Sequence, residues 1–259
     1  MAHRGEVKLS ARIFMTFSDL LSPRLPMDGE PRWNGEESAA FDLYLQSERE
    51  IPASLLMENA GQATARLALD LLEPESPSPG ASILIVAGPG NNGGDALVAA
   101  RGMLQASPFP IEVWAPLGLP AAADSPAGQA REAARALGIP IHSSAEPSTG
   151  LSSAGLILDG LFGVGLARPL EGVSHAAIEA IDAAPAPIFA LDLPSGLHAD
   201  TGEILGIAPR ALATLSYIGP KQGLEQGAGP ELAGTIYTTS IGVAPAVAQD
   251  WLAQRRSRA

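Results

Sequence analysis

The residues best suited to binding or chemistry stand in a loop rich in glycine and asparagine, residues 88–95, directly after the apolar run 83–86. Gly88, Gly90 and Gly93 fit the pattern GxGxxG. Glycines at this spacing permit a tight turn in which backbone amides at the start of a helix face a phosphate. The loop therefore predicts a site for a phosphate-bearing ligand, and a tight turn without a ligand is the alternative.

The same loop carries side-chain oxygen atoms on Asn91, Asn92 and Asp95. Backbone amides suit an anion, whereas these oxygens suit a cation or a ligand rich in hydroxyl groups. Two common nucleotide sites are disfavoured. The next predicted strand ends at residues 113–116 without the acidic residue that holds the ribose in NAD-dependent dehydrogenases. A Walker A loop would need a lysine where Asp95 stands.

Two aspartates, Asp159 and Asp192, each end an apolar segment. Asp159 is followed by a second glycine-rich loop, residues 160–170, in which Gly163 and Gly165 allow close approach of the backbone to a ligand. A helix cap or a turn is the alternative role for one such aspartate. Two of them, together with the first loop, indicate that three strand ends form a single ligand pocket.

Three further residues are candidates for this pocket. Ser195 follows Asp192 in a Pro-Ser-Gly segment, but GxSxG is absent and no histidine is placed to act as its base, so a serine hydrolase is disfavoured. Arg168 fits either a phosphate partner or a surface charge. Lys221 follows another predicted strand and fits a phosphate-binding or orienting role, with a surface loop lysine as the alternative.

Alternating strands and helices must position these loops. Strands are predicted over 82–87, 111–115, 139–142, 156–159, 188–191, 213–217 and 235–240, and helices over 36–48, 52–72, 93–105, 121–137 and 174–183. This order predicts an α/β fold: a Rossmann-like, doubly wound, mostly parallel sheet with helices on both faces, in one domain of three layers, α/β/α. Ligands of such sheets bind beyond the carboxyl ends of the strands, where the loops lie.

The domain is predicted over residues 34–259. Residues 1–33 contain several prolines and no sustained periodicity, so they are interpreted as an N-terminal extension that drapes over the domain or stays mobile. A stretch rich in proline, serine and glycine at 74–80 is predicted to interrupt the regular secondary structure. Within the second helix, the segment 57–61 contains an asparagine and a glycine, which indicates either close helix packing or an ordinary core position.

The composition excludes several other functions. The 259 residues include 28 acidic and 16 basic side chains, a net charge of −12, which disfavours nucleic-acid and membrane-surface binding. The absence of cysteine excludes thiol catalysis, disulfides and cysteine-ligated metals. The most apolar run, 83–87, is too short to span a membrane and no signal segment is evident, so a cytoplasmic protein is expected. Arg255, Arg256 and Arg258 are interpreted as a solvated tail.

Taken in order along the chain, the motifs resemble the NAD(P)H-hydrate epimerase family, the YjeF N-terminal domain. The resemblance runs from Glu36 to Val243. It rests on the segments 56–61 (LMENAG), 90–95 (GNNGGD), 159–163 (DGLFG), 165–166 (GL), 192–196 (DLPSG), 200–202 (DTG) and 220–223 (PKQG). It implies an isomerase that interconverts the R and S forms of hydrated NADH and NADPH. It also implies that this repair of damaged nicotinamide nucleotides feeds a separate dehydratase, and that the protein is a homodimer.

The resemblance also assigns roles to individual residues. Substrate contacts are implied for Asn91, Asn92, Gly93, Gly94, Asp95, Gly163, Val164, Gly165, Leu166, Ala167, Arg168, Pro169 and Asp192, with Lys221 as a further substrate-binding candidate. Asn92, Asp159 and Ser195 match the potassium ligands of the family. All three supply oxygen, which fits a hard monovalent cation.

The chemistry of epimerisation indicates a carboxyl group as acid or base. The hydrated ring carbon carries a hydroxyl group beside the ring nitrogen, so proton donation to the leaving oxygen gives an iminium-like species that water re-enters from the other face. Asp159 or Asp192 is predicted in this role. A non-catalytic nucleotide-binding or scaffold protein is the competing function, disfavoured by the retained pocket residues, and an oxidoreductase is disfavoured by the missing ribose carboxylate.

Overall fold

The structure is a computed structural model that describes residues 22–26, 29–72, 82–104, 106–120 and 122–258. The predicted break at 74–80 and most of the predicted extension lie outside the described residues. The described chain forms one seven-stranded sheet in the order β3-β2-β1-β4-β5-β6-β7, with every pair parallel. The strands are β1 (Ser82–Ala87), β2 (Ile111–Trp114), β3 (Ile141–His142), β4 (Ala154–Gly160), β5 (Ile188–Leu191), β6 (Ala213–Tyr217) and β7 (Thr235–Thr239). The predicted doubly wound fold is confirmed.

The central strands are apolar along their whole length because the sheet is buried on both faces. In β1, Ile83 and Ile85 pack into one hydrophobic cluster, and Leu84 and Val86 pack into another on the opposite face. This alternation follows from the two-residue repeat of a strand. The order of the strands reverses between β1 and β4, so the loops after these two strands diverge and leave a crevice at the carboxyl edge.

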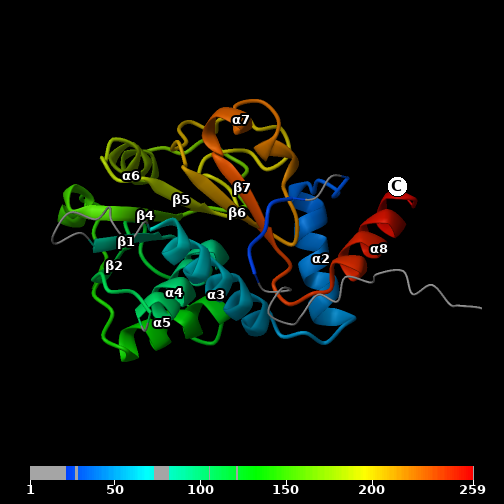
Figure 1. Cartoon of the computed structure of the whole chain (residues 1–259), viewed down its shortest axis with the longest axis horizontal. Helices are drawn as coiled ribbons and strands as arrows, with labels where there is room; N and C mark the ends of the chain where they lie inside the picture. The colour runs from blue at the N-terminus through cyan, green and yellow to red at the C-terminus, as the bar shows by residue number, and fades with distance from the viewer. Residues whose placement is uncertain (1–21, 27–28, 73–81, 105, 121, 259) are drawn as a thin grey trace, which may run out of the picture.

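Helices cover both faces of the sheet (Figure 1). Helices α3 (Ala53–Leu71), α4 (Asn91–Leu104) and α5 (Pro126–Ala136) share one face, and α6 (Val173–Asp182) packs on the other. The shorter helices are η1 (Thr149–Ser152), η2 (Gln222–Leu224) and α7 (Gly229–Leu232). Helices α2 (Gly35–Ser47) and α8 (Pro245–Arg256) lie side by side beyond β7. Within the described ranges, no helix has both the length and the apolarity needed to cross a membrane.

Two predicted elements differ from the structure. The helix predicted from residue 121 begins instead at Pro126, because the Ser125 hydroxyl accepts a hydrogen bond from Gly128 N at 3.0 Å and the proline occupies the first turn. At the C-terminus, two of the three arginines interpreted as a solvated tail, Arg255 and Arg256, belong to α8, a helix that was not predicted from the sequence. Arg255 and Arg256 form ion pairs with Glu36 and Glu37 of α2, so that interpretation is wrong for these two residues.

The described part of the N-terminal extension lies against the domain. Arg24 pairs with Thr238 of β7 in an antiparallel bridge, and Trp33 pairs with Lys221. The Trp33 side chain is 2% exposed and packs against Phe41 of α2 and Trp251 of α8. Residue 33 therefore belongs to the hydrophobic core, and it connects the extension to helices α2 and α8.

Close packing of α3 on α4 brings the segment 57–61 beside the first loop. A Cβ atom at Gly61 would lie 2.4 Å from Val98 and 2.7 Å from the Asp95 carbonyl oxygen, closer than atoms can approach. Glycine therefore sets the separation of the two helices. Of the two interpretations left open by the sequence, the structure supports close helix packing.

Candidate functional site

The loops at the carboxyl ends of β1, β4, β5 and β6 surround a cavity of about 890 Å³, closed on one side by α2 and α3. This size is within the range of pockets for small ligands. The register of the sheet explains the convergence, because Val86 pairs with Asp159 and Asp159 pairs with Ala190, so neighbouring strands end at the same edge. The cavity is therefore the crevice expected for a doubly wound sheet.

The first loop contributes three of its predicted residues to the cavity wall: Asn91, Asn92 and Asp95. Gly93 and Gly94 are buried behind that wall. A Cβ atom at Gly93 would lie 1.9 Å from the Gly88 carbonyl oxygen, so the turn requires glycine there. The turn leads directly into α4, whose first residues Asn91 and Asn92 line the cavity, and the first amides of a helix have no acceptor within the helix. This is the geometry that binds an anion.

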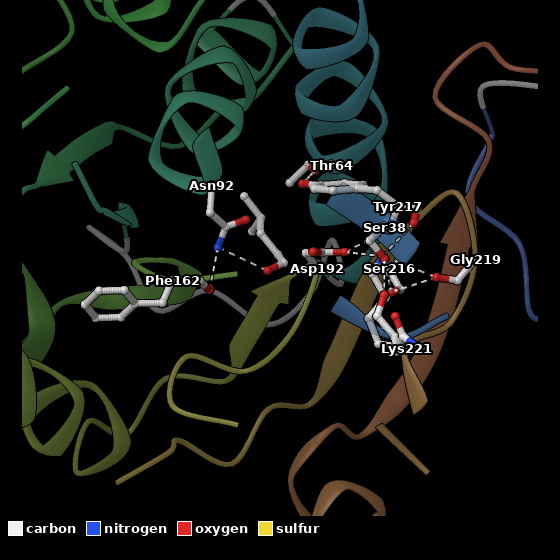
Figure 2. Close-up of polar contacts among 11 residues, drawn as sticks. Ser38, Thr64, Asn92, Phe162, Asp192, Ser216, Tyr217, Gly219 and Lys221 are labelled. Atoms are coloured by element: carbon white, nitrogen blue, oxygen red, sulfur yellow. Dashed lines mark hydrogen bonds and ion pairs between the residues drawn. The ribbon is translucent and has the colours of Figure 1, made fainter. Parts of the chain in front are cut away.

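Asn92 connects the first loop to the other two. Its side-chain amide nitrogen donates hydrogen bonds to the Phe162 carbonyl at 2.8 Å and to the Leu191 carbonyl at 3.2 Å, as Figure 2 shows. The residue thus links the turn after β1 to the ends of β4 and β5. One polar side chain fixes the relative positions of the three loops that line the cavity.

Asp159 and Ser195 form a buried pair beneath the cavity wall. The Ser195 hydroxyl donates to Asp159 Oδ1 at 2.6 Å and its backbone amide donates to Oδ2 at 2.8 Å. Asp159 has no exposed surface, and neither residue lines the cavity. Burial raises the pKa of Asp159, and the hydrogen bonds from Ser195 and Leu161 oppose this effect. The carboxyl group is held in place by three donors.

Asp192 and Lys221 form a second pair, and both line the cavity (Figure 2). Lys221 is 3% exposed, and its ammonium group donates to Asp192 Oδ1 at 2.7 Å and to the Tyr217 carbonyl at 2.7 Å. The Tyr217 amide also donates to Asp192 Oδ1, at 3.2 Å. Because these contacts engage the ammonium group, Lys221 fits the orienting role among the alternatives left open by the sequence.

The backbone of the cavity wall is left-handed at three residues. Asp192, Ile218 and Ile241 have φ values of 66°, 69° and 47°, a conformation that is strained for the two β-branched isoleucines and more readily adopted by aspartate. All three line the cavity. Such conformations persist only where the surroundings enforce them, and here the Ile241 carbonyl accepts a hydrogen bond from the Asn59 side chain at 2.9 Å. Strain of this kind is typical of functional sites.

The second predicted loop lines the cavity from Gly163 to Arg168, whereas Pro169 does not reach it. Arg168 is exposed, and within the described ranges it forms no ion pair. Its guanidinium group is therefore available to an anion in the cavity.

Helix α2 contributes residues to the cavity that were not predicted from the sequence. Ser38, Asp42 and Gln46 line the cavity at a spacing of four residues, which places them on one face of the helix. Asp42 is an exposed residue at the cavity wall, but the protein atoms around its carboxyl group desolvate it and raise its pKa to about 6; nearby Lys221 lowers the pKa and Asp192 raises it. This polar stripe is visible in the sequence, but only the fold shows that it faces the ligand site.

Asp95 is the most perturbed carboxyl group of the site. Burial raises its pKa well above the usual range, and the charges of Asp192 and Asp42 add to the effect. Tyr217, also on the wall, has its pKa raised by burial and by Asp95, and its hydroxyl group lies 2.9 Å from the Thr64 hydroxyl.

The three predicted cation ligands come together through the main chain of Phe162. Its carbonyl oxygen accepts from Asn92 at 2.8 Å and from Ser195 at 3.3 Å, and Ser195 contacts Asp159 at 2.6 Å. Among the described residues, no three side chains of His, Cys, Asp or Glu form a metal-binding group. A carboxylate with amide, hydroxyl and carbonyl groups fits a hard cation rather than a transition metal.

Comparison with known proteins places the chain in a family. Residues 53–223 match the family described as YjeF-related protein N-terminus. The NAD(P)H-hydrate epimerase of Achromobacter xylosoxidans is 43% identical over 191 residues, which cover 73% of this chain and 86% of that protein. The NAD(P)H-hydrate epimerase of Levilactobacillus brevis is 35% identical over 207 residues, covering 80% of this chain and 92% of that protein.

Two further similarities concern a longer protein and a solved structure. The bifunctional NAD(P)H-hydrate repair enzyme Nnr of Thermofilum pendens is 39% identical over 208 residues, or 77% of this chain, which spans only 38% of that enzyme. The crystal structure of yeast ynu0, YNL200c, superposes with a TM-score of 0.68 at 23% identity and covers 75% of this chain and 83% of that one. At this identity the yeast structure supports the fold alone.

Proposed function

This chain belongs to the YjeF-related N-terminal family, and from that premise we propose that it is an NAD(P)H-hydrate epimerase, an isomerase that interconverts the two epimers of hydrated NADH and NADPH. One observation carries the proposal. The GNNGGD loop, the loop 163–168 and Asp192 converge on a single cavity at the carboxyl edge of the sheet, in a chain 43% identical to a protein of that name.

The cavity supplies the groups that the reaction needs. Loss of the hydroxyl group from the hydrated carbon requires a proton donor, and addition of water to the opposite face requires a proton acceptor. We assign Asp192 as a group that exchanges a proton with the reacting atoms, because it lines the cavity and its position is fixed by Lys221. Asp159 lies behind the wall, which supports a role in cation binding and orientation instead.

A potassium ion is proposed as the cofactor, held by Asn92, Asp159 and Ser195. The support is the donor set described above, together with the buried Asp159 carboxyl group, which among the described residues has no cationic side chain as hydrogen-bond partner. Such an ion would supply a fixed positive charge beside the substrate. Replacing KCl by choline chloride at constant ionic strength should lower the epimerisation rate, and an unchanged rate would remove this part of the proposal.

The pyrophosphate of the substrate is assigned to the N-terminus of α4 and to Arg168. Exposed amides at a helix start favour an anion, and the free guanidinium group adds a positive charge at the same wall. Lys221 already binds Asp192, so it is assigned an orienting role. Local amides thus explain how a chain with a net charge of −12 holds two phosphates.

Turnover of a single purified epimer tests the proposed function. The protein is added to one epimer of hydrated NADH or NADPH, and the mixture is followed by NMR and by absorbance of the reduced nicotinamide. Equilibration of the two epimers without redox change supports the epimerase. A change in reduced-nicotinamide absorbance would indicate an oxidoreductase instead, and binding without turnover would indicate the scaffold function.

The family also suggests an oligomeric state, a partner enzyme and a cellular location for this protein. We expect a homodimer in solution, to be tested by light scattering. A separate dehydratase is the proposed downstream partner; the Thermofilum relative, described as bifunctional, is a longer protein of which this chain spans 38%. The cytoplasm is the proposed location, because a substrate that carries a pyrophosphate does not cross a lipid bilayer unaided.

A further inference from the structure

The face of α2 that lines the cavity carries one ionisable side chain, Asp42, between Ser38 and Gln46. The opposite side of this helix is anchored, because Phe41 and Leu45 are fully buried and Phe41 packs on Trp33. The position of the Asp42 backbone is therefore fixed. Within the described part of the chain, no hydrogen-bond donor contacts its carboxylate, so both oxygens are available to a ligand.

We propose that Asp42 is a second acid–base group of the epimerisation, acting from the α2 wall while Asp192 acts from the wall formed by the ends of β5 and β6. The inference rests on the proposed function and deepens it. Asp42 falls outside the family motifs matched in the sequence, and it reaches the site only because α2 folds over the cavity.

Two groups are needed because the reaction uses both faces of the ring. On one face, a protonated carboxyl group donates its proton to the hydroxyl oxygen, the carbon–oxygen bond breaks and water leaves, while the nitrogen lone pair forms a carbon–nitrogen double bond. On the other face, a second water adds to that carbon and passes one proton to a carboxylate. Atoms and charge balance, and no oxidation occurs. In the reverse direction the two carboxyl groups exchange roles.

The charged and titratable groups facing Asp42 make it suitable for proton transfer near neutral pH. They are Asp95 of α4, Asp192 and Lys221 at the ends of β5 and β6, and Tyr217. Although Asp42 is exposed to the cavity, partial desolvation of its carboxyl group by the surrounding protein raises its pKa to about 6, with Lys221 opposing and Asp192 adding to the rise. A group with a pKa near the working pH is both an effective acid and an effective base. Asp192 differs from Asp42 in its hydrogen bonding, because the Lys221 ammonium group donates to its carboxylate.

The test compares Asp42→Asn and Asp42→Glu with the wild-type chain, starting from one purified epimer between pH 5 and 9, after subtraction of the rate without protein. Asp42→Asn should lower kcat by about 100-fold or more with little change in KM. For the epimer whose conversion uses Asp42 as the base, the substitution should also remove the fall in rate below about pH 6 that protonation of Asp42 produces in the wild type. Asp42→Glu should retain part of the wild-type rate and should again show a fall in rate at low pH.

The control is Glu36→Gln, which removes a carboxylate from the same helix at a side chain that is 82% exposed and outside the cavity. It should retain the wild-type rate. Binding of unhydrated NADH, measured by calorimetry, and the thermal midpoint separate catalysis from folding. A variant Asp42→Asn that unfolds or no longer binds NADH contradicts the catalytic assignment, as does one with wild-type kcat and acid limb. If the wild-type chain itself does not interconvert the epimers, the proposed function fails first.

Discussion

At the scale of single residues, the ion pair of Asp192 and Lys221 is the most constrained feature of the cavity. Asp192 adopts a left-handed backbone conformation, and the Lys221 ammonium group is enclosed by Asp192, Tyr217, Ser216 and Gly219. Removal of one partner leaves the other buried without its counter-charge, which is costly. The two residues therefore act as one unit, with Asp192 facing substrate and Lys221 positioning it.

This unit leads to a prediction for the variants Asp192→Asn and Lys221→Met. Each should lower kcat by about 100-fold or more, and the double variant should be no slower than the worse single variant, because residues that act together are not additive. Steady-state kinetics on one epimer measures all three. Losses that multiply in the double variant would show that the residues act independently.

At the scale of elements, the contact between α3 and α4 fixes the first loop, and Gly61 sets its distance. Gly61→Ala should lower the free energy of unfolding by about 1 to 3 kcal/mol, because the added methyl group forces the helices apart. Urea denaturation measures the effect. Gly90→Ala serves as the control, since a Cβ atom there meets nothing within 4 Å. Equal destabilisation by both substitutions would contradict this account.

A second element contact joins the start of α2 to the end of α8. Glu37 caps α2 by accepting from Asn34 N at 3.0 Å, and it pairs with Arg256 at 2.7 Å. Burial alone would raise its pKa, but the hydrogen bonds from Arg256 and Asn34 outweigh burial and lower it. A carboxyl group with a lowered pKa stabilises the fold above its unfolded value of 4.5 and loses that contribution as the pH falls.

Glu37→Gln should therefore destabilise the protein by about 1 kcal/mol at pH 7, and the difference should shrink toward pH 4. Thermal unfolding at several pH values measures it. Glu36→Gln, at a largely exposed ion pair with Arg255, should have a smaller effect. A pH-independent difference for Glu37→Gln would show that shape rather than charge is responsible.

At the scale of the whole molecule, the chain has an excess of acidic residues, and three carboxyl groups, Asp42, Asp95 and Asp192, line the same cavity. Repulsion between their charges opposes folding. The pKa of Asp42 is raised from 3.8 to about 6, so its contribution to stability is complete below 3.8 and is lost as the pH rises through 6. Asp42→Asn should match the wild type at pH 4 and unfold at a higher temperature at pH 7 and above. Calorimetry at both pH values checks this, and a lower midpoint at pH 7 would contradict the sign.

The sequence by itself determined the fold and the order of the loops. Four-residue apolar runs such as 83–86 and 188–191 have no polar face, so they must be central parallel strands, and the residues that follow them must meet at one edge. For this reason Asn92, Asp159, Asp192 and Ser195 were predictable as neighbours before any contact was known.

Only the tertiary structure decided how these neighbours divide their roles. Asp159 and Asp192 occupy equivalent positions in the sequence, but one lies behind the wall with Ser195 and the other faces the cavity with Lys221. Asp42 reaches the site because α2 folds over the cavity, and α2 is held there by Trp33 and by α8 from the other end of the sequence. The physical reason is that hydrophobic periodicity fixes the face of a helix that is buried, whereas the partner of that face and the exposure of each polar side chain depend on packing between distant segments.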